Sequence, residues 1–355
     1  MKEKIKLILQ DGSEFDGYSF GKAISTSGEV VFNTGMMGYP ETMTDPSYKG
    51  QILCLTYPMV GNYGVPNGEI EDNLLKNFES ANIQIQGLII DELSEEYHHW
   101  EAKQSLHEWM EKNDIPGIYG VDTRALTKKL REKGTILGKI IVDKDVPYYD
   151  PNVENLVDQV SVKEPVTYER GPKKIIVMDC GIKNNIIRSF LKRDITVIRV
   201  PWNYDFFEHN LEFDGVFISN GPGDPKMCDK TIGIISKALE REIPTFGICL
   251  GNQLLALAAG ADTYKLKYGH RSQNQPCKEL GTNKCFITSQ NHGFAVKEDS
   301  IPSEWEPWFV NVNDNTNEGM KHKSKPFFSV QFHPEATPGP VDTAFLFDRF
   351  IEKLG

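Results

Sequence analysis

The sequence predicts two successive domains: a β-rich α+β domain, then an α/β domain with a mainly parallel sheet and helices on both faces. The first observation is a change near residue 173, where short glycine-containing strand runs give way to regular strand–helix alternation. The second is length, because 355 residues exceed one ordinary hydrophobic core. We expect domains at residues 1–150 and 173–355. Residues 146–172 contain four prolines and many charges, and we expect residues 151–172 to form a linker.

The N-terminal part is expected to contain many strands and few helices. The two helices that we expect span His99–Lys112 and Thr123–Lys133, and Gly134 is placed to end the second. A short helix is also expected in the linker, near Val153–Val160. The strand-like runs are Lys6–Gln10, Glu29–Asn33, Gln51–Tyr57, Gln86–Ile90 and Ile136–Val142.

The alternation after residue 173 is typical of βαβ units and a parallel sheet. The expected strands are Lys174–Asp179, Thr196–Val200, Gly215–Ser219, Thr245–Ile248, Cys285–Thr288 and Phe327–Phe332. The expected helices are Lys183–Lys192, Lys230–Arg241, Asn252–Ala259 and Val341–Leu354. Open sheets of this type bind ligands beyond the carboxyl ends of their strands, so functional residues are expected there.

Charge and composition exclude several classes of protein. The net charge is −11 and no basic block occurs, which argues against nucleic-acid binding. No apolar run reaches transmembrane length, and the first residues do not form a signal peptide. The six cysteines include no Cys-x-x-Cys pair, so no disulfide framework is expected. We therefore expect a cytoplasmic protein that does not bind membranes.

The run Gly247-Ile248-Cys249-Leu250-Gly251 lies where a buried strand meets a helix, with the spacing of a nucleophile elbow. A nucleophile on so tight a turn needs small residues on both sides. The helix that follows offers its positive end and free N–H groups, which favour a thiolate. Cys249 is the candidate nucleophile, and the N–H of Leu250 is the natural oxyanion donor. A buried structural cysteine is the alternative.

A base for this thiol is available in Val330-Gln331-Phe332-His333-Pro334-Glu335. Side chains two apart on an extended chain point to the same side, and Pro334 favours an extended His333. Glu335 can therefore orient His333 toward Cys249, as in a catalytic triad. Alone, His-Pro-Glu is a weak signal, but beside a cysteine elbow it indicates acyl-transfer chemistry.

Two further polar runs follow expected strands. Ser219-Asn220-Gly221-Pro222-Gly223-Asp224-Pro225 fixes an unusual backbone path, either as a rigid turn or as a loop that approaches a ligand. Gln290-Asn291-His292-Gly293-Phe294 could receive the amino-acid end of a ligand, although His292 alone favours a structural role. No phosphate loop or dinucleotide fingerprint occurs, so no nucleotide site is expected in this chain. No metal site is expected from His98-His99 and Glu95-Glu96, because adjacent residues on a helix point apart.

Together these motifs resemble the class I, or triad, glutamine amidotransferases, and this resemblance implies that the C-terminal domain of this chain is flavodoxin-like. More narrowly, the chain resembles the small, glutamine-hydrolysing chains of carbamoyl phosphate synthetases. Matching stretches in the N-terminal half, a domain that other triad amidotransferases lack, include Phe32–Tyr39, Thr44–Tyr48 and Val121–Thr127. One departure is the loop Ser272-Gln273-Asn274-Gln275, where the family usually has small residues and then Asn-His-Pro.

The resemblance implies roles for individual residues. Cys249 would attack the amide of L-glutamine, His333 would transfer protons, and Glu335 would orient His333. The backbone of Gly221 and Leu250 would stabilise the oxyanion. The glutamine-binding residues implied are Ser47, Gly221, Gly223, Leu250, Gln253, Asn291, Gly293 and Phe294.

The resemblance also implies a partner, a large synthetase chain that would use ATP, magnesium and bicarbonate to convert the ammonia into carbamoyl phosphate for arginine or pyrimidine synthesis. A heterodimer, or a higher oligomer of heterodimers, is expected. No cofactor or metal is expected in this chain. Two other hypotheses are an inactive scaffold that docks to the synthetase and passes ammonia, and a free-standing glutamine hydrolase.

Overall fold

The computed structural model describes residues 3–355 of the chain. These residues form two compact units, one that ends at Glu154 and one that spans Asn155–Gly355. Within residues 3–355, no helix combines the length and the apolar content needed to span a bilayer.

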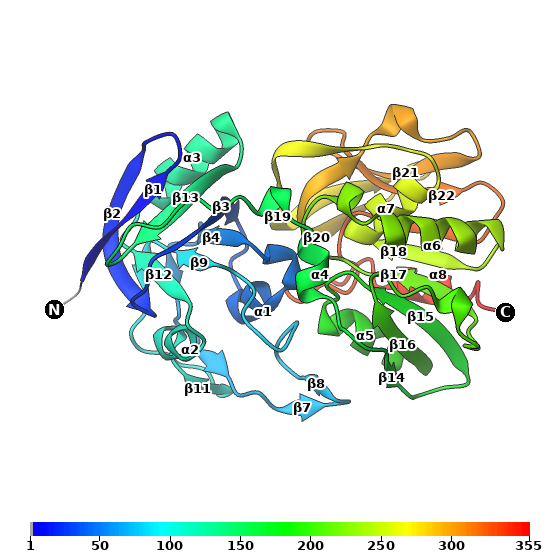
Figure 1. Ribbon diagram of the computed structural model, residues 1–355, viewed down its shortest axis with the longest axis horizontal. Coiled ribbons are helices and arrows are strands. Elements are labelled where there is room, and N and C mark those ends of the chain that lie inside the picture. Colours follow the sequence, from blue (N-terminus) through cyan, green and yellow to red (C-terminus); the bar gives the residue numbers. More distant parts are fainter. Residues whose placement is uncertain (1–2) are drawn as a thin grey trace. The chain divides into compact units, whose positions relative to one another are not determined.

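The first unit, drawn in blue to green in Figure 1, is built on a closed barrel with the strand order β1-β13-β3-β4-β9-β12-β2. Its interior is apolar, with a core that includes Val31, Leu53 and Leu88. The barrel strands are β1 (Lys4–Leu9), β2 (Glu14–Gly21), β3 (Thr26–Asn33), β4 (Gln51–Leu55), β9 (Gly87–Ile89), β12 (Pro116–Tyr119) and β13 (Ile136–Ile141). All five predicted strand runs lie in this barrel, whereas β2 and β12 were not predicted.

The first unit contains few helices, as predicted. They are α1 (Tyr39–Thr44), the 3-10 turn η1 (Pro46–Tyr48), α2 (Leu106–Lys112) and α3 (Thr123–Lys133). The prediction for α3 is confirmed, and Gly134 caps its C-terminus. The paired short strands outside the barrel are β5 (Met59–Val60), β6 (Val65–Pro66), β7 (Ile70–Glu71), β8 (Leu74–Leu75), β10 (Glu92–Leu93) and β11 (Ala102–Gln104).

The predicted helix His99–Lys112 is wrong in its first half. Ser105 caps α2 through reciprocal hydrogen bonds with Glu108, which start the helix at Leu106. The preceding residues Ala102–Gln104 are instead extended and pair with β6 as strand β11.

The second unit contains one ten-stranded sheet with the order β14-β16-β15-β17-β18-β23-β22-β21-β19-β20. Five adjacent strands, from β16 to β23, are parallel, as the alternation predicts. The strands are β14 (Val166–Tyr168), β15 (Lys173–Asp179), β16 (Ile195–Pro201), β17 (Gly215–Ile218), β18 (Thr245–Ile248), β19 (Thr263–Glu279), β20 (Cys285–Val296), β21 (Trp305–Asn311), β22 (Asn317–His322) and β23 (Phe327–Val330).

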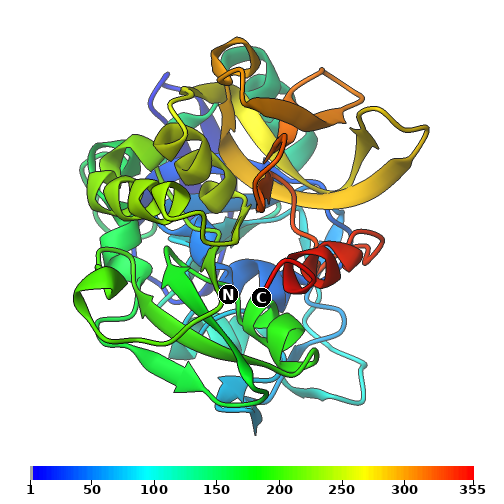
Figure 2. The ribbon, with the colours of Figure 1, turned by 90° about the vertical axis from the view of Figure 1, so that its right-hand side faces the viewer.

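Both faces of the parallel strands are covered by helices, which confirms the predicted fold class. On one face, Ile176 of β15 belongs to the same apolar cluster as Ile235 of α6 and Leu254 of α7. On the other face, the ring of Phe190 of α5 lies 5.0 Å from Phe217 of β17 and 5.1 Å from Phe347 of α8. Figure 2 shows α8, in red, and the α6–α7 pair on opposite sides of the strands. The helices are α4 (Leu156–Val160), α5 (Asn184–Leu191), α6 (Asp229–Glu240), α7 (Leu250–Ala258) and α8 (Phe345–Ile351).

The last helix is shorter than the predicted Val341–Leu354. Backbone bonds from Ala344 to Val341 and from Leu346 to Thr343 form tighter turns before α8 begins at Phe345. The segment 151–172, expected as a linker, carries α4 where a short helix was predicted. It also carries β14, which pairs with β16 at the edge of the sheet.

An antiparallel extension made of β22, β21, β19 and β20 was not predicted beyond parts of β20. The expected loop Ser272–Gln275 is also wrong, because these residues lie within β19. Ser272 pairs with Gln290 and Gln275 pairs with Thr288, with a register shift between the two pairs. A β-bulge therefore takes up the irregular sequence without interrupting the strand.

Candidate active site

Cys249 stands between a strand and a helix, as the elbow pattern predicts. It follows β18 directly and is the N-cap residue of α7, with φ 57° and ψ −107°. This is a sparsely populated backbone conformation for a residue with a side chain, and such strain gathers at functional sites. The backbone N–H of Cys249 donates to the carbonyl of Val330, and its thiol donates to the carbonyl of Asn291 at 3.6 Å.

Glycine is required on both sides of the nucleophile. A Cβ added to Gly251 would overlap the carbonyl oxygen of Ile218, and a Cβ added to Gly247 would overlap the carbonyl of Gly251. The elbow thus packs directly against β17. The expectation that only small residues fit beside Cys249 is confirmed by these contacts.

His333 and Glu335 are joined as the extended His-Pro-Glu run predicts. Nδ1 of His333 lies 2.7 Å from Oε1 of Glu335, and both side chains are buried. His333 is fixed through its backbone as well, because its N–H donates to the carbonyl of Ser289. Its other ring nitrogen, Nε2, is buried and has no hydrogen-bond partner within residues 3–355. Nε2 is thus the nitrogen available to the sulfur of Cys249.

Electrostatics couple the three side chains. Burial lowers the pKa of His333, but the charges of Glu335 and Cys249 outweigh it and raise the pKa to about 10. Burial likewise raises the pKa of Glu335, but Lys183 and His333 outweigh it and lower the pKa to about 2. At neutral pH this pair is therefore an imidazolium beside a carboxylate, which is the arrangement that stabilises a neighbouring thiolate.

The two residues expected to hold an oxyanion are neighbours. A Cβ added to Gly221 would lie 2.9 Å from Cδ2 of Leu250 and would overlap the carbonyl of Cys180. Only glycine lets the loop after β17 approach this closely. Leu250 is the first residue of α7, so its N–H lies at the positive end of the helix.

Five of the predicted substrate residues lie on β20 and α7, and Leu250 is the first residue of α7. Nε2 of Gln253 donates to the carbonyl of Phe294 at 2.9 Å and to Oε1 of Gln331 at 3.1 Å. Asn291 is the residue whose carbonyl contacts the Cys249 sulfur. Gly293 lies between Asn291 and Phe294 on the same strand.

The surroundings of Gly223 and Ser47 are different. Gly223 adopts φ 85° and faces Leu156 of α4, with which an added Cβ would make ordinary contact at 3.5 Å. Ser47 lies in the first unit, in η1, where it is buried and its N–H donates to Oδ1 of Asp45. Their roles in glutamine binding remain predictions.

The residues that could hold a metal are not those near position 98. His98 and Glu96 form only an exposed pair at 3.8 Å. Among residues 3–355, three side chains of types that ligate metals bring their donor atoms close together. They are His270, His292 and Glu318.

Comparison with known proteins identifies the family. Residues 7–140 match the family described as "Carbamoyl-phosphate synthase small chain, CPSase domain", and residues 176–353 match "Glutamine amidotransferase class-I". The carbamoyl phosphate synthase arginine-specific small chain of Debaryomyces hansenii is 50% identical over 368 residues, which cover 99% of this chain and 86% of that protein. The chain belongs to the carbamoyl-phosphate synthase small-chain family.

Other relatives of this small chain are much longer. The multifunctional protein CAD of Squalus acanthias is 54% identical over 98% of this chain, which covers 16% of that protein. The mitochondrial carbamoyl-phosphate synthase [ammonia] of Homo sapiens is 50% identical over 98% of this chain, which covers 23% of that protein. Among solved structures, a glutamine amidotransferase from Thermotoga maritima is 20% identical, with a TM-score of 0.39. The match covers 51% of this chain and 81% of the chain in that structure.

Two residues of the small chain that hold the triad were missed in the sequence. Nζ of Lys183 lies 3.1 Å from Oε1 of Glu335, and both side chains are buried. Nδ2 of Asn185 donates to the carbonyl of Glu335 and to Oγ1 of Thr337. These contacts join positions about 150 residues apart, and no local pattern signals them. The one available signal is that a buried carboxylate such as Glu335 needs a cation as its partner, but the sequence does not show which cation this is.

Proposed function

We propose that this small chain is a glutamine-hydrolysing subunit that makes ammonia for carbamoyl phosphate synthesis. The observation that carries the proposal is the arrangement of three side chains. Cys249 stands on a strained elbow and interacts electrostatically with His333, whose Nδ1 is held by Glu335. This is the relation of nucleophile, base and orienting group that acyl transfer from an amide requires.

The reaction begins when the Cys249 thiolate attacks the side-chain carbonyl carbon of glutamine. The negative charge that develops on the oxygen is stabilised by the N–H groups of Gly221 and Leu250. His333 gives its proton to the nitrogen, the C–N bond breaks, and ammonia leaves a glutamyl thioester on Cys249. His333 then takes a proton from water, which attacks the thioester; the C–S bond breaks, glutamate is released, and the Cys249 thiolate and the protonated His333 are restored.

Substrate recognition is assigned to polar groups around this centre. Asn291, Gly293 and Phe294 of β20, together with Gln253 of α7, hold the amino-acid end of glutamine. Gly223 completes the proposed set within this unit, and the resemblance to the family adds Ser47 of the first unit.

The ammonia is passed to a large synthetase chain or to a fused synthetase region. The absence of a nucleotide motif in the sequence supports this division, because ATP and magnesium then act on the partner. The long multifunctional relatives also support it, since this chain matches only 16% of the CAD protein of Squalus acanthias. We propose a heterodimer, or an oligomer of heterodimers.

The carbamoyl phosphate is proposed to supply arginine synthesis, pyrimidine synthesis or both. Relatives include arginine-specific small chains as well as multifunctional proteins. The cytoplasm is the proposed compartment, because all six cysteines are free thiols.

The test is Cys249→Ser, assayed together with the large chain. Carbamoyl phosphate synthesis from glutamine should be lost, whereas synthesis from free ammonia should continue. Cys285→Ser is the matched control, because Cys285 is an exposed free thiol, and it should retain both activities. Undiminished glutamine-dependent synthesis by Cys249→Ser would refute the proposal. A wild-type chain that releases no glutamate beside its partner would favour the scaffold instead.

A further inference from the structure

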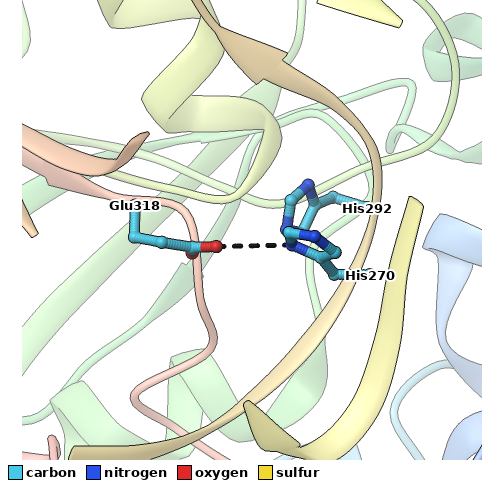
Figure 3. A group of neighbouring side chains, drawn as sticks. All are labelled: His270, His292 and Glu318. Atoms are coloured by element: carbon cyan, nitrogen blue, oxygen red, sulfur yellow. Dashed lines mark ion pairs between the residues drawn. The ribbon is translucent and has the colours of Figure 1, made fainter. Parts of the chain in front are cut away.

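A second group of buried polar side chains lies on three strands of the antiparallel extension. One of its members, His292, follows Asn291 directly in the sequence. His270 is on β19, His292 on β20 and Glu318 on β22, and their donor atoms all lie within 4.8 Å of one another. Figure 3 shows the two imidazoles side by side, with the carboxylate of Glu318 directed at His270. All three residues are buried. The amidotransferase reaction proposed above uses none of these side chains.

The outer nitrogen of each imidazole is already held by an oxygen. Nε2 of His270 lies 2.8 Å from Oδ2 of Asp314, and Nδ1 of His292 lies 2.8 Å from the carbonyl oxygen of Phe294. A carboxylate or carbonyl on the outer nitrogen is the usual support for a histidine that binds a metal through its other nitrogen. Both imidazoles are thus oriented with their inner nitrogens toward each other.

The inner nitrogens face further oxygen atoms. Oε1 of Gln290 lies 3.0 Å from Nδ1 of His270 and 3.0 Å from Nε2 of His292. Oε1 of Glu318 lies 3.4 Å from the same nitrogen of His270. A neutral imidazole has only one N–H, so only one of its two nitrogens can donate, and the oxygen at the short distance of 2.8 Å from each outer nitrogen would be its acceptor. The inner lone pairs of neutral imidazoles would therefore point at oxygen lone pairs, a repulsive arrangement that a cation between them would reverse.

The spacing fits a small ion. Four ligands at about 2.0–2.2 Å from a tetrahedral centre are separated by roughly 3.3–3.6 Å. The three distances above, 3.0, 3.0 and 3.4 Å, are close to such edges. The charge fits as well, because the second oxygen of Glu318 is fully buried and has no hydrogen-bond partner within residues 3–355. A buried carboxylate of this kind needs a counter-charge.

We propose that His270, His292, Glu318 and Gln290 bind one divalent transition-metal ion of the zinc type. Two imidazole nitrogens and two oxygens form its coordination shell, with Asp314 and the Phe294 carbonyl as outer supports. The side chain of Asp314 is 43% exposed, so the ion enters from that side of the cluster. The role is structural: the ion ties β19, β20 and β22 together next to Asn291. The proposal does not depend on the amidotransferase function.

A proton on His270 is the competing counter-charge. Burial lowers the pKa of His270, but Asp314 and Glu318 outweigh it and raise the pKa to about 9. An imidazolium at His270 would donate to Asp314 and to the Gln290 and Glu318 oxygens, and it would repel a metal ion. The metal ion and this proton would occupy the same lone pair of His270, so only one of them can be present at a time.

The sequence could not reveal this site because its ligands are far apart along the chain. His270 and Glu318 are separated by 48 positions, 318 minus 270, and lie on strands that were not predicted. The sequence-based expectation of no metal is therefore replaced by this proposal.

The experiment uses the full chain carrying Cys249→Ser, so that the elbow thiol does not bind the probe ion. Cobalt(II), a spectroscopic substitute for zinc, is titrated into the chain after treatment with a chelator. One equivalent should bind, with the intense visible bands of tetrahedral cobalt and no thiolate charge-transfer band. Zinc should displace it. Glu318→Gln and His270→Asn should each weaken binding roughly 10-fold or more.

The matched controls are Glu306→Gln and His322→Asn, which change the same residue types on β21 and β22 outside the cluster. Both should bind cobalt as tightly as the parent chain. No stoichiometric binding, or binding that Glu318→Gln leaves unchanged, would overturn the proposal. It would mean that a proton on His270, or a rotated Gln290 amide that donates to the imidazoles, satisfies the cluster.

A second measurement covers the case in which the cluster variants do not fold. X-ray absorption of the zinc-loaded Cys249→Ser chain should show two imidazoles and only nitrogen or oxygen ligands. Sulfur in the zinc shell, or fewer than two imidazoles, would contradict the proposal.

Discussion

His333 and His270 are both buried imidazoles beside carboxylates, but the atoms around them differ. Nδ1 of His333 is held by Glu335, and its Nε2 has no hydrogen-bond partner within residues 3–355. Both nitrogens of His270 face oxygen atoms, those of Asp314 on one side and of Gln290 and Glu318 on the other. The first imidazole therefore has a nitrogen free for proton transfer, and the second does not.

The backbone conformation near the catalytic residues also differs from that around His270. Near His333, the nucleophile Cys249 has φ 57°, and Ala336 and Thr337 have φ 58° and 50°. Around His270, the cluster residues lie on strands of the antiparallel extension. The nucleophile thus stands on a strained turn, whereas the residues that we assign to structure stand on strands, with Gly269 (φ 71°) and a register shift beside His270. A histidine–carboxylate pair alone does not indicate catalysis; the environment of the second nitrogen decides.

The strongest test of this difference makes the same substitution at both histidines. His333→Asn should lower kcat for glutamine hydrolysis by roughly 10³-fold, about 4 kcal/mol, because proton transfer is lost. His270→Asn should lower kcat by less than about 10-fold, since it leaves the proton-transfer groups in place. Glutamate release by the purified variants measures both. Equal losses would remove the distinction between the two sites.

A second prediction concerns the strained elbow. Gly251→Ala places a Cβ against the carbonyl of Ile218, so it should destabilise the fold by about 1–3 kcal/mol and displace Cys249. Gly233→Ala is the matched control. Gly233 lies in α6, and an added Cβ there meets nothing within 4 Å, so the change should stabilise the chain by about 0.5–1 kcal/mol. Denaturant unfolding of both variants gives these values, and a neutral Gly251→Ala would show that the elbow tolerates bulk.

The third and smallest effect is on the pH profile. His333 has its pKa raised to about 10, so glutaminase activity should persist through neutral pH and fall near pH 10 as the imidazolium loses its proton. Glu335→Gln removes a charge that raises this pKa. The alkaline limb should then move to lower pH, by about 1–3 units.

The profile of kcat/KM against pH measures this shift. Glu298→Gln, at a surface 3-10 turn, is the control and should leave the limb in place. A limb that stays near pH 10 in Glu335→Gln would show that another group titrates there.

Local patterns explain which parts of the molecule the sequence predicts. The strand–turn–helix at Cys249 and the pair His333 and Glu335 are each contained within a few residues, so their geometry follows from backbone rules. The parallel strands were predictable because apolar runs alternate with helical spacing. The closed form of the barrel was not, since strand pairing joins distant segments such as β1 and β13.

Other features depend on contacts that no local pattern encodes. Lys183 and Asn185 reach the triad across about 150 positions. The long strand β19 contains a bulge and polar residues, so Ser272–Gln275 resembles a loop in sequence although it is paired. The metal cluster is hidden for the same reason, because three separate strands of the antiparallel extension supply its ligands.

The central claim is that covalent chemistry takes place at Cys249. Acid quenching of the purified chain during glutamine turnover, followed by peptide mass spectrometry, tests it most directly. The account predicts a glutamyl thioester on the peptide containing Cys249 and none on the peptide containing the exposed Cys285. Glutamate release at the full rate in Cys249→Ser, or an adduct carried by another residue during turnover, would contradict it.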